Sequence, residues 1–324
     1  NQAATSYIDA SVAADTTYYY RLSATNATGT SAPTAGMRVQ TPASVGSGAS
    51  RFVNISTRAY CSTGNNVTIG GFVINGTSDK RVLIRAVGPS LTAQGIGESE
   101  ALLDPSIEVH SGASVIASND DWATNDNAAD IVSVATQIGA AALQPTDTKS
   151  SALLLSLAPG VYSFVANGHA GTSGIVLLEV YDADTPGSAS TFVNISTRAY
   201  STGGNGVTIG GFVINGSASK QVLIRAVGPT LTTYGLGSAE VLSNPVIELH
   251  QGAPVIATND NWTDNDNASS IISTSARIGA APFASTDATS AALLVKLPPG
   301  VYSFIARGKS NASGITLVEV YDAD

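Results

Sequence analysis

The chain contains one stretch of about 130 residues twice, and this duplication constrains its fold more than any other feature. Residues 52–184 recur as residues 192–324 without insertion or deletion, so each residue of the second copy carries a number 140 higher than its counterpart. Roughly three positions in five are identical. A shift of strand pairing by one residue would turn every strand inside out, so gap-free repetition predicts one fold for both copies.

Within each copy, apolar residues alternate with polar ones at the two-residue period of β-strands. We expect eight or nine short strands per copy and one short helix at 128–138, capped by Asp126 or Asn127. The buried positions should match between the copies. In the first copy, the positions expected in the core are Val53, Ile69, Ile84, Leu154, Tyr162, Phe164 and Val180.

This pattern predicts an all-β chain with two tandem, jelly-roll-like antiparallel β-sandwiches, at 51–184 and 191–324. Residues 185–190 (TPGSAS) are predicted to link them. Hydrophobic residues make up 43% of the chain and charged residues only 12%, with many Gly, Ser, Thr and Asn. That composition suits strands joined by many turns.

Charge and cysteine content exclude several classes of partner and site. The net charge is −9 and no Lys/Arg cluster exists, which argues against nucleic acid as a partner. No apolar run approaches the roughly 20 residues of a membrane span. The single cysteine, Cys61, is Ser201 in the second copy, so it is neither a shared nucleophile nor half of an internal disulfide.

Residues 1–43 read as strand material, with runs at 5–12, 16–26 and 35–41. The run Tyr18-Tyr19-Tyr20-Arg21-Leu22-Ser23-Ala24-Thr25-Asn26, followed by Gly29 and Ser31, resembles the last strands of a fibronectin type III domain. The resemblance implies that residues 1–43 are the end of such a module, with Tyr18 at its tyrosine corner. Residues 44–50 are then a linker. Because the chain begins at Asn1 without Met, we expect a mature or truncated product.

The second half of each copy carries residues typical of a known secreted module. In the first copy these are residues 107–122 (IEVHSGASVIASNDDW), 151–168 (SALLLSLAPGVYSFVANG) and 173–182 (SGIVLLEVYD). They resemble the bacterial pre-peptidase C-terminal domain. The resemblance implies a non-catalytic β-sandwich appended to secreted proteins, and hence an extracellular or bacterial cell-surface location.

Each copy has one acidic, amide-rich turn that suits a Ca²⁺ site, since Ca²⁺ takes six to eight oxygen ligands. The candidate ligands are Asn119, Asp120, Asp121 and Asp126 in the first copy, and Asn259, Asp260 and Asp266 in the second. Asp104 and Asp147 are weaker candidates, since Asp104 becomes Asn244. The alternative is a pair of Asx turns in which the side chains satisfy the backbone of their own loop.

The two tryptophans, Trp122 and Trp262, occupy matching positions beside these turns. Each is either a stacking platform for a polysaccharide or a plug at the end of a sandwich. No H-E-x-x-H, G-x-S-x-G or P-loop sequence occurs, which argues against an enzyme. Arg85 lies on an otherwise apolar strand, so we expect Glu179 or Asp182 to pair with it.

These observations favour a non-enzymatic, extracellular structural or adhesive protein. The alternative is a carbohydrate-binding accessory region of a larger secreted enzyme. An incomplete first module would leave apolar side chains uncovered, and the candidates are Tyr18, Tyr20, Leu22 and Val39. We expect either a second copy of the chain to cover them, as in a homopolymeric filament, or missing strands of a longer chain.

Overall fold

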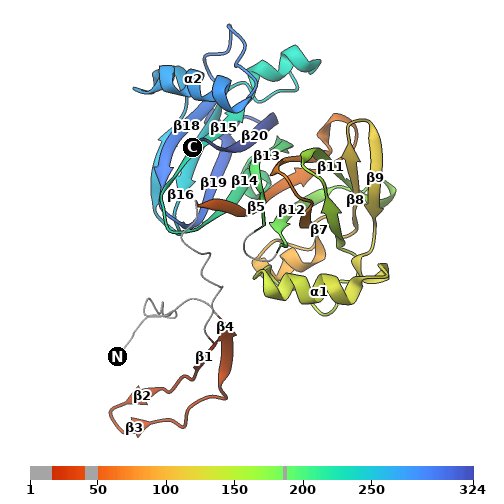
Figure 1. Cartoon of the computed structure of the whole chain (residues 1–324), viewed down its shortest axis with the longest axis vertical. Helices are drawn as coiled ribbons and strands as arrows, with labels where there is room; N and C mark the ends of the chain where they lie inside the picture. The colour runs from red at the N-terminus through yellow and green to blue at the C-terminus, as the bar shows by residue number, and fades with distance from the viewer. Residues whose placement is uncertain (1–16, 41–49, 185–187) are drawn as a thin grey trace. The chain divides into compact units, whose positions relative to one another are not determined.

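The computed structural model describes residues 17–40, 50–184 and 188–324 (Figure 1). It forms two compact units, residues 1–47 and residues 48–324. Most of the predicted linkers at 44–50 and 185–190, and the expected strand at 5–12, lie outside the described residues. The prediction of an all-β chain with antiparallel pairing is confirmed.

The described part of the first unit is a single long hairpin. Strand β1 (Thr17–Tyr20) pairs antiparallel with β4 (Met37–Gln40), and β2 (Thr25–Asn26) pairs with β3 (Gly29–Thr30) at its far end. The rings of Tyr18 and Tyr20 stack with centroids 6.2 Å apart, and both residues are half-buried. Leu22, by contrast, is 74% exposed. Val39 pairs with Tyr18 through the backbone, but its side chain lies outside the described residues.

Each repeat contributes eight strands among the described residues, within the predicted range. In the first repeat they are β5 (Arg51–Cys61), β6 (Thr68–Gly76), β7 (Lys80–Val87), β8 (Pro105–Ser111), β9 (Ser114–Asn119), β10 (Ser151–Leu157), β11 (Gly160–Gly168) and β12 (Gly174–Asp182). In the second they are β13 (Ser190–Ser201), β14 (Thr208–Asn215), β15 (Lys220–Val227), β16 (Pro245–His250), β17 (Val255–Asn259), β18 (Ala291–Leu297), β19 (Gly300–Gly308) and β20 (Gly314–Asp322).

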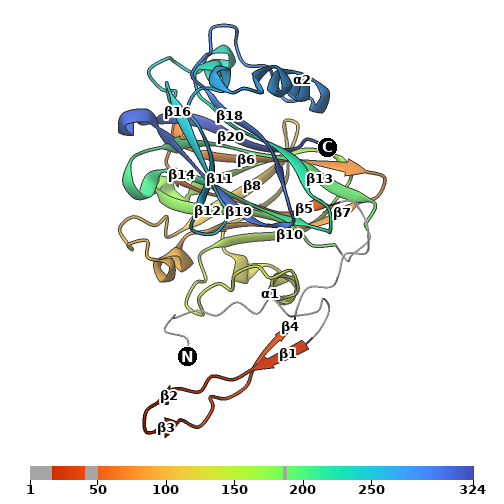
Figure 2. The same ribbon diagram turned by 90° about the vertical axis from the view of Figure 1, so that its left-hand side faces the viewer.

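The expected helix is present in both repeats, as α1 (Ala128–Gln137) and α2 (Ala268–Ile278). Asn127 and Asn267 hold the N-cap positions, but neither side chain makes a capping hydrogen bond, so the predicted side-chain cap is wrong. α1 packs on β7 and β10, whereas α2 packs on β18, and Figure 2 shows the two helices on opposite sides of the strands. The remaining helical turns are short 3₁₀ segments: η1 (Gly64–Asn66), η2 (Pro89–Gln94), η3 (Trp122–Thr124), η4 (His169–Gly171), η5 (Gly204–Gly206), η6 (Pro229–Tyr234), η7 (Trp262–Asp264) and η8 (Lys309–Asn311).

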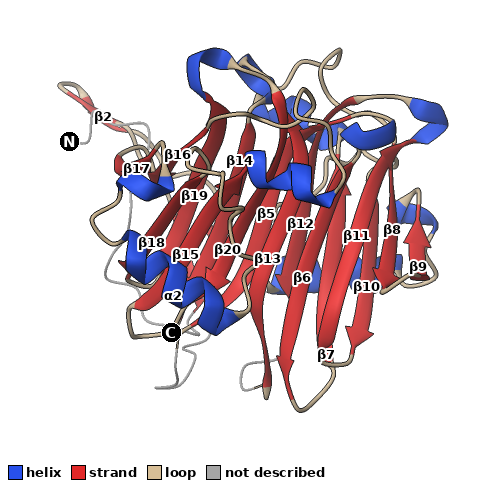
Figure 3. Ribbon diagram, turned by 90° about the horizontal axis from the view of Figure 1, so that it is seen from above, coloured by secondary structure: helices blue, strands red, loops and turns tan. Residues whose placement is uncertain are grey.

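The strands pair into two rows of eight, and each row takes four strands from each repeat (Figure 3). One row runs β9-β8-β11-β6-β13-β20-β15-β18, and the other runs β17-β16-β19-β14-β5-β12-β7-β10. All pairs within the rows are antiparallel. The repeats therefore join edge to edge twice, through β6 with β13 and through β14 with β5. The equivalent strands β5 and β13 also pair in parallel, at Phe52 with Phe192 and at Tyr60 with Tyr200, which connects the two rows into one sheet of 16 strands. The boundary between the repeats in sequence is not a boundary between compact units.

Contacts across the junction occur in symmetric pairs. The hydroxyls of Thr57 and Thr197, which are equivalent positions, lie 2.8 Å apart in the interior. Arg58 donates to the carbonyl of Asn205, while Arg198 donates to the carbonyl of Asn65. The rings of Phe52 and Phe212, and of Phe72 and Phe192, meet edge to face at 5.8 and 5.9 Å. The junction thus has the character of an isologous dimer interface within one chain.

One large core takes its side chains from strands of both rows. It includes the predicted Ile84, Tyr162, Phe164 and Val180. Three predicted core positions are wrong: Val53, Ile69 and Leu154 are only partly buried. The error at Val53 arises from a β-bulge in the pairing of β14 with β5. Val213 pairs with Asn54 and Ile214 pairs with Phe52, so Val53 is skipped and Phe52 is the buried residue. Burial classes nevertheless match between equivalent positions of β5 and β13, as the repetition predicts.

Candidate metal centre

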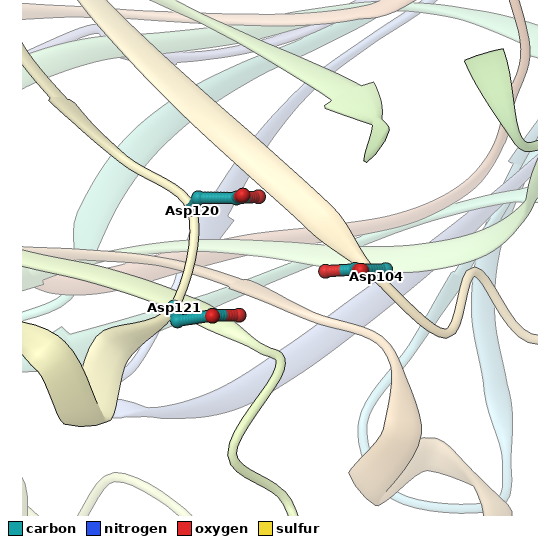
Figure 4. Close-up of side chains that lie close together, drawn as sticks. All are labelled: Asp104, Asp120 and Asp121. Atoms are coloured by element: carbon teal, nitrogen blue, oxygen red, sulfur yellow. The ribbon is translucent and has the colours of Figure 1, made fainter. Parts of the chain in front are cut away.

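Three aspartates of the first repeat meet at one end of the hairpin formed by β8 and β9. Asp104 directly precedes β8, and Asp120 and Asp121 directly follow β9. Antiparallel pairing of the two strands brings the start of β8 beside the end of β9. One oxygen from each carboxylate lies within 4.8 Å of the others, and Figure 4 shows the three groups pointing toward a common space.

The hydrogen bonding of these carboxylates leaves buried oxygens without a donor. The Oδ1 atoms of Asp104, Asp120 and Asp121 are all inaccessible to solvent and accept no hydrogen bond, although Asp121 Oδ1 lies 3.2 Å from the Lys149 ammonium. Buried polar atoms in proteins normally have a partner, so the unpartnered oxygens of Asp104 and Asp120 are unusual. A hard divalent cation coordinated by oxygen would satisfy all three carboxylates at once.

Two basic side chains already face this cluster. Lys149 Nζ lies 3.5 Å from Asp104 Oδ2 and 3.2 Å from Asp121 Oδ1, and His169 Nδ1 lies 3.1 Å from Asp120 Oδ2. Hydrogen bonding to Asp121 raises the pKa of Lys149. Both basic side chains are about half exposed, so a cation would displace them without opening the core.

The second repeat has the same geometry with less charge. Its equivalent residues are Asn244, Asp260 and Asn261, whose Oδ1 atoms are likewise buried without a hydrogen bond. Lys309 Nζ contacts Asp260 at 2.5 Å, and Thr289 stands where the first repeat has Lys149. One carboxylate in place of three makes this a much poorer site for a divalent cation.

The other predicted ligands lie outside the cluster. Asn119 Nδ2 donates to the carbonyl of Asp121, and its Oδ1 accepts from the amide of Ala152, so the side chain fixes the turn to β10. Asn259 makes the equivalent bonds in the second repeat. Asp126 and its counterpart Asp266 are exposed.

Asp147 instead lies buried beneath the turn, where it accepts hydrogen bonds from Ser90 and Ser150. It also borders a small polar cavity of about 280 Å³ with Pro89, Thr92 and Gln144.

Both tryptophans are tied to the fold by their indole nitrogens. Trp122 Nε1 donates to the carbonyl of Asp147 at 2.7 Å, and Trp262 does the same to Asp287. Trp122 packs against the small core beneath α1, while Trp262 stacks on Phe283 with centroids 5.0 Å apart. These contacts favour a packing role for both rings at the ends of the strands. Each ring is half-buried.

Most of the remaining buried charges form ion pairs between neighbouring strands. The predicted partner of Arg85 is confirmed as Glu179, which also accepts a hydrogen bond from Tyr181. The second repeat repeats this arrangement with Arg225 and Glu319. Burial raises the pKa of Tyr181 well above its ordinary value. Such groups hold strands together and are not arranged around a cavity.

Comparisons with known proteins leave the chain without a family. No protein-family model and no curated protein matches it. Seven chains of solved structures match, among them a DUF4785 family protein from Legionella pneumophila. It shares 8% identity over 81% of this chain and 82% of its own, with a TM-score of 0.19, which is too low to carry an argument about fold or function. No helix among the described residues is long and apolar enough to cross a membrane.

Proposed function

We propose that this chain is a non-enzymatic structural or adhesive part of an extracellular, bacterial cell-surface protein. The observation that carries the proposal is the double edge-to-edge junction, which joins two repeats into one body with a shared core. Strand edges are otherwise sites of uncontrolled pairing, and here four of them are covered within the chain. Two repeats joined into one folded unit in this way suit a structural role.

The resemblances in sequence support the same placement. Residues typical of the pre-peptidase C-terminal domain and of a fibronectin type III module both point to secreted proteins of bacteria. We infer that the two rows face one another as the layers of a jelly-roll-like sandwich. The core that draws side chains from both rows supports this arrangement.

We further propose that the chain assembles with copies of itself through the hairpin of residues 17–40. A two-stranded hairpin is marginally stable in water by itself. This one leaves Tyr19, Leu22 and Met37 between 64% and 74% exposed. A second copy that covers these side chains would form a head-to-tail contact, and contacts that do not close generate a filament.

Light scattering of the full chain and of variants tests this assembly. Replacement of both Leu22 and Met37 by Asp should abolish growth of the scattering signal. The control is Ala27→Asp, which adds charge at the exposed turn of the same hairpin and should leave assembly intact. A full chain that stays monomeric at all concentrations would contradict the proposal. That result would favour the alternative that missing strands of a longer chain cover the hairpin.

Retention on polysaccharides decides between the structural role and the alternative of a carbohydrate-binding accessory region. The structural role predicts no retention on any glycan column. Retention that is lost in the variants Trp122→Ala and Trp262→Ala would favour the carbohydrate-binding alternative instead.

A second candidate function is Ca²⁺ binding in the first repeat. The convergence of Asp104, Asp120 and Asp121 supports it, as do the buried Oδ1 atoms of Asp104 and Asp120, which accept no hydrogen bond. Hard cations favour such oxygen ligands, and backbone carbonyls and water would complete the coordination shell. The ion would stabilise the end of the β8–β9 hairpin, because binding only to the folded state raises its stability.

Calorimetry with Ca²⁺ and with a chelator tests this site. Chelation should lower the melting temperature of the natural chain but not that of Asp120→Asn. The matched control, Asp260→Asn in the second repeat, should retain the effect. Lys149→Met should bind Ca²⁺ more tightly, since it removes a competing cation. An identical melting curve with excess Ca²⁺ and with excess chelator would leave only the turn interpretation.

A further inference from the structure

The lysine that begins β7 is enclosed among carboxylates. The side chain of Lys80 has no exposed surface. Its Nζ atom lies 2.8 Å from Asp182 Oδ1, 3.0 Å from Asp184 Oδ2 and 3.0 Å from the carbonyl of Ser190, with the ring of Phe192 at 5.2 Å. The Asp182 side chain is itself only 2% exposed. An amine and a carboxyl group are therefore held in contact away from water.

The groups around this pair match those that acyl transfer requires. The backbone N–H of Asp184 donates to Asp182 Oδ1 at 3.1 Å, on the oxygen that would gain charge if the amine attacked the carboxyl carbon. The carboxylate of Asp184 is the base beside the amine. Burial alone would raise its pKa, but hydrogen bonds from the Arg81 amide, Ser188 and Lys80 hold the pKa of Asp184 below its ordinary value.

We propose that Lys80 and Asp182 condense to an isopeptide bond that covalently joins β7 to β12. The neighbouring strands are already in register there, since Val82 pairs with Asp182. Fixed contact between the reacting groups supplies the high effective concentration that such a condensation needs.

The step balances without a cofactor. One proton passes from the Lys80 ammonium to the Asp182 carboxylate, which makes a neutral amine and a carboxylic acid. Nζ then attacks Cγ, the C–N bond forms, and Oδ1 carries the negative charge toward the Asp184 N–H. Nζ gives a second proton to the Asp184 carboxylate, which passes it to Oδ2. The Cγ–Oδ2 bond breaks, Oδ2 leaves as water with both protons, and Asp184 is ionised again.

The second repeat has a lysine and two aspartates at the equivalent positions, but its aspartates are more exposed to solvent. Lys220 Nζ lies 2.7 Å from both oxygens of Asp322 and 2.8 Å from Asp324. However, the Asp322 side chain is 21% exposed and that of Asp324 is 52% exposed. Water that reaches a carboxylate stabilises its charge, so the fully enclosed pair at Lys80 is the one proposed to condense.

Intact-mass spectrometry of the denatured full chain tests the proposal directly. The mass should be lower than the sequence mass by one water molecule. After tryptic digestion, the peptide that ends at Arg81 should remain joined to the peptide that contains Asp182, with Lys80 uncleaved. A water lost through succinimide formation would leave Lys80 cleavable, so digestion separates the two. The mass of the denatured chain does not depend on assembly, so this test is independent of the proposed filament.

Three variants define the chemistry. Lys80→Arg keeps the cation but should show the full mass, and Asp184→Asn should show the full mass or a slow loss of water over days. Lys220→Arg, the matched control, should lose one water as the natural chain does. Loss of two waters, with the second bond mapped to Lys220 and Asp322, would extend the proposal to both repeats. A natural chain at full mass after prolonged incubation would show an ion pair only and overturn it.

Discussion

The buried pair of Arg85 and Glu179 provides a quantitative test of how neighbouring strands within a repeat are held together. Arg85 donates through Nε to Glu179 Oε2 at 2.9 Å, and both side chains are almost wholly buried. Glu179→Leu would leave the guanidinium with the carbonyl of Ala141 as its remaining hydrogen-bond acceptor, and Tyr181 without its acceptor. Removal of one partner of a buried ion pair costs about 3–5 kcal/mol. We expect the free energy of unfolding to fall by about that amount.

Urea unfolding followed by circular dichroism measures the change. The double variant Arg85→Met/Glu179→Leu should recover much of the loss, because apolar replacement of a whole buried pair is often neutral or stabilising. Glu319→Leu should cost as much as Glu179→Leu, since Arg225 holds Glu319 in the same geometry at 2.8 Å. A loss below about 1 kcal/mol for Glu179→Leu, which is typical of exposed pairs, would refute the reasoning.

Three further predictions follow from single positions. Gly70→Ala should lower the free energy of unfolding in urea by about 1–3 kcal/mol, because a Cβ there would lie 2.1 Å from Phe164 Cζ. The control Gly203→Ala places its Cβ in open space and should leave the stability unchanged. Burial raises the pKa of the Cys61 thiol, so a thiol reagent should label it only on unfolding, and labelling of the native chain at neutral pH would contradict its burial. The lowered pKa of Asp184 contributes stability that is present above the ordinary value of 3.8 and is lost as pH falls through the lower folded value. In a Lys80→Arg chain, which cannot form the proposed bond, the free energy of unfolding should therefore fall more below pH 3.8 than it does when Asp184→Asn is added, and equal losses would contradict the lowered pKa.

Local patterns in the sequence predicted the elements well. Alternation of apolar residues predicted eight or nine strands per repeat, and Asp126 or Asn127 before an apolar run predicted the position of the helix. The charge on Arg85 required an acidic partner on a neighbouring strand, and Glu179 is that partner. These features depend on a few adjacent residues or on the cost of a buried charge, so they can be read without knowledge of the fold.

Long-range pairing could not be predicted in the same way. Both copies contain the same strands, so nothing in the sequence of β5 indicates that its second neighbour is β14 of the other repeat. The inward position of Phe52 depends on a skipped residue in that pairing. Asp104 was a weaker candidate because its counterpart in the second copy is Asn244. Only the β8–β9 hairpin brings Asp104 beside Asp120, which lies 16 residues further along the chain.

Amide hydrogen exchange of the full chain, read by mass spectrometry, tests the central claim that the two repeats are one body. The strands β5, β6, β13 and β14 would carry open edges if each repeat stood alone. The account predicts that their amides exchange as slowly as those of β12 and β20, which have strand partners on both sides. Fast exchange at the amides of β5 that face β14, with slow exchange at those that face β12, would show that the repeats are separate and would contradict the account.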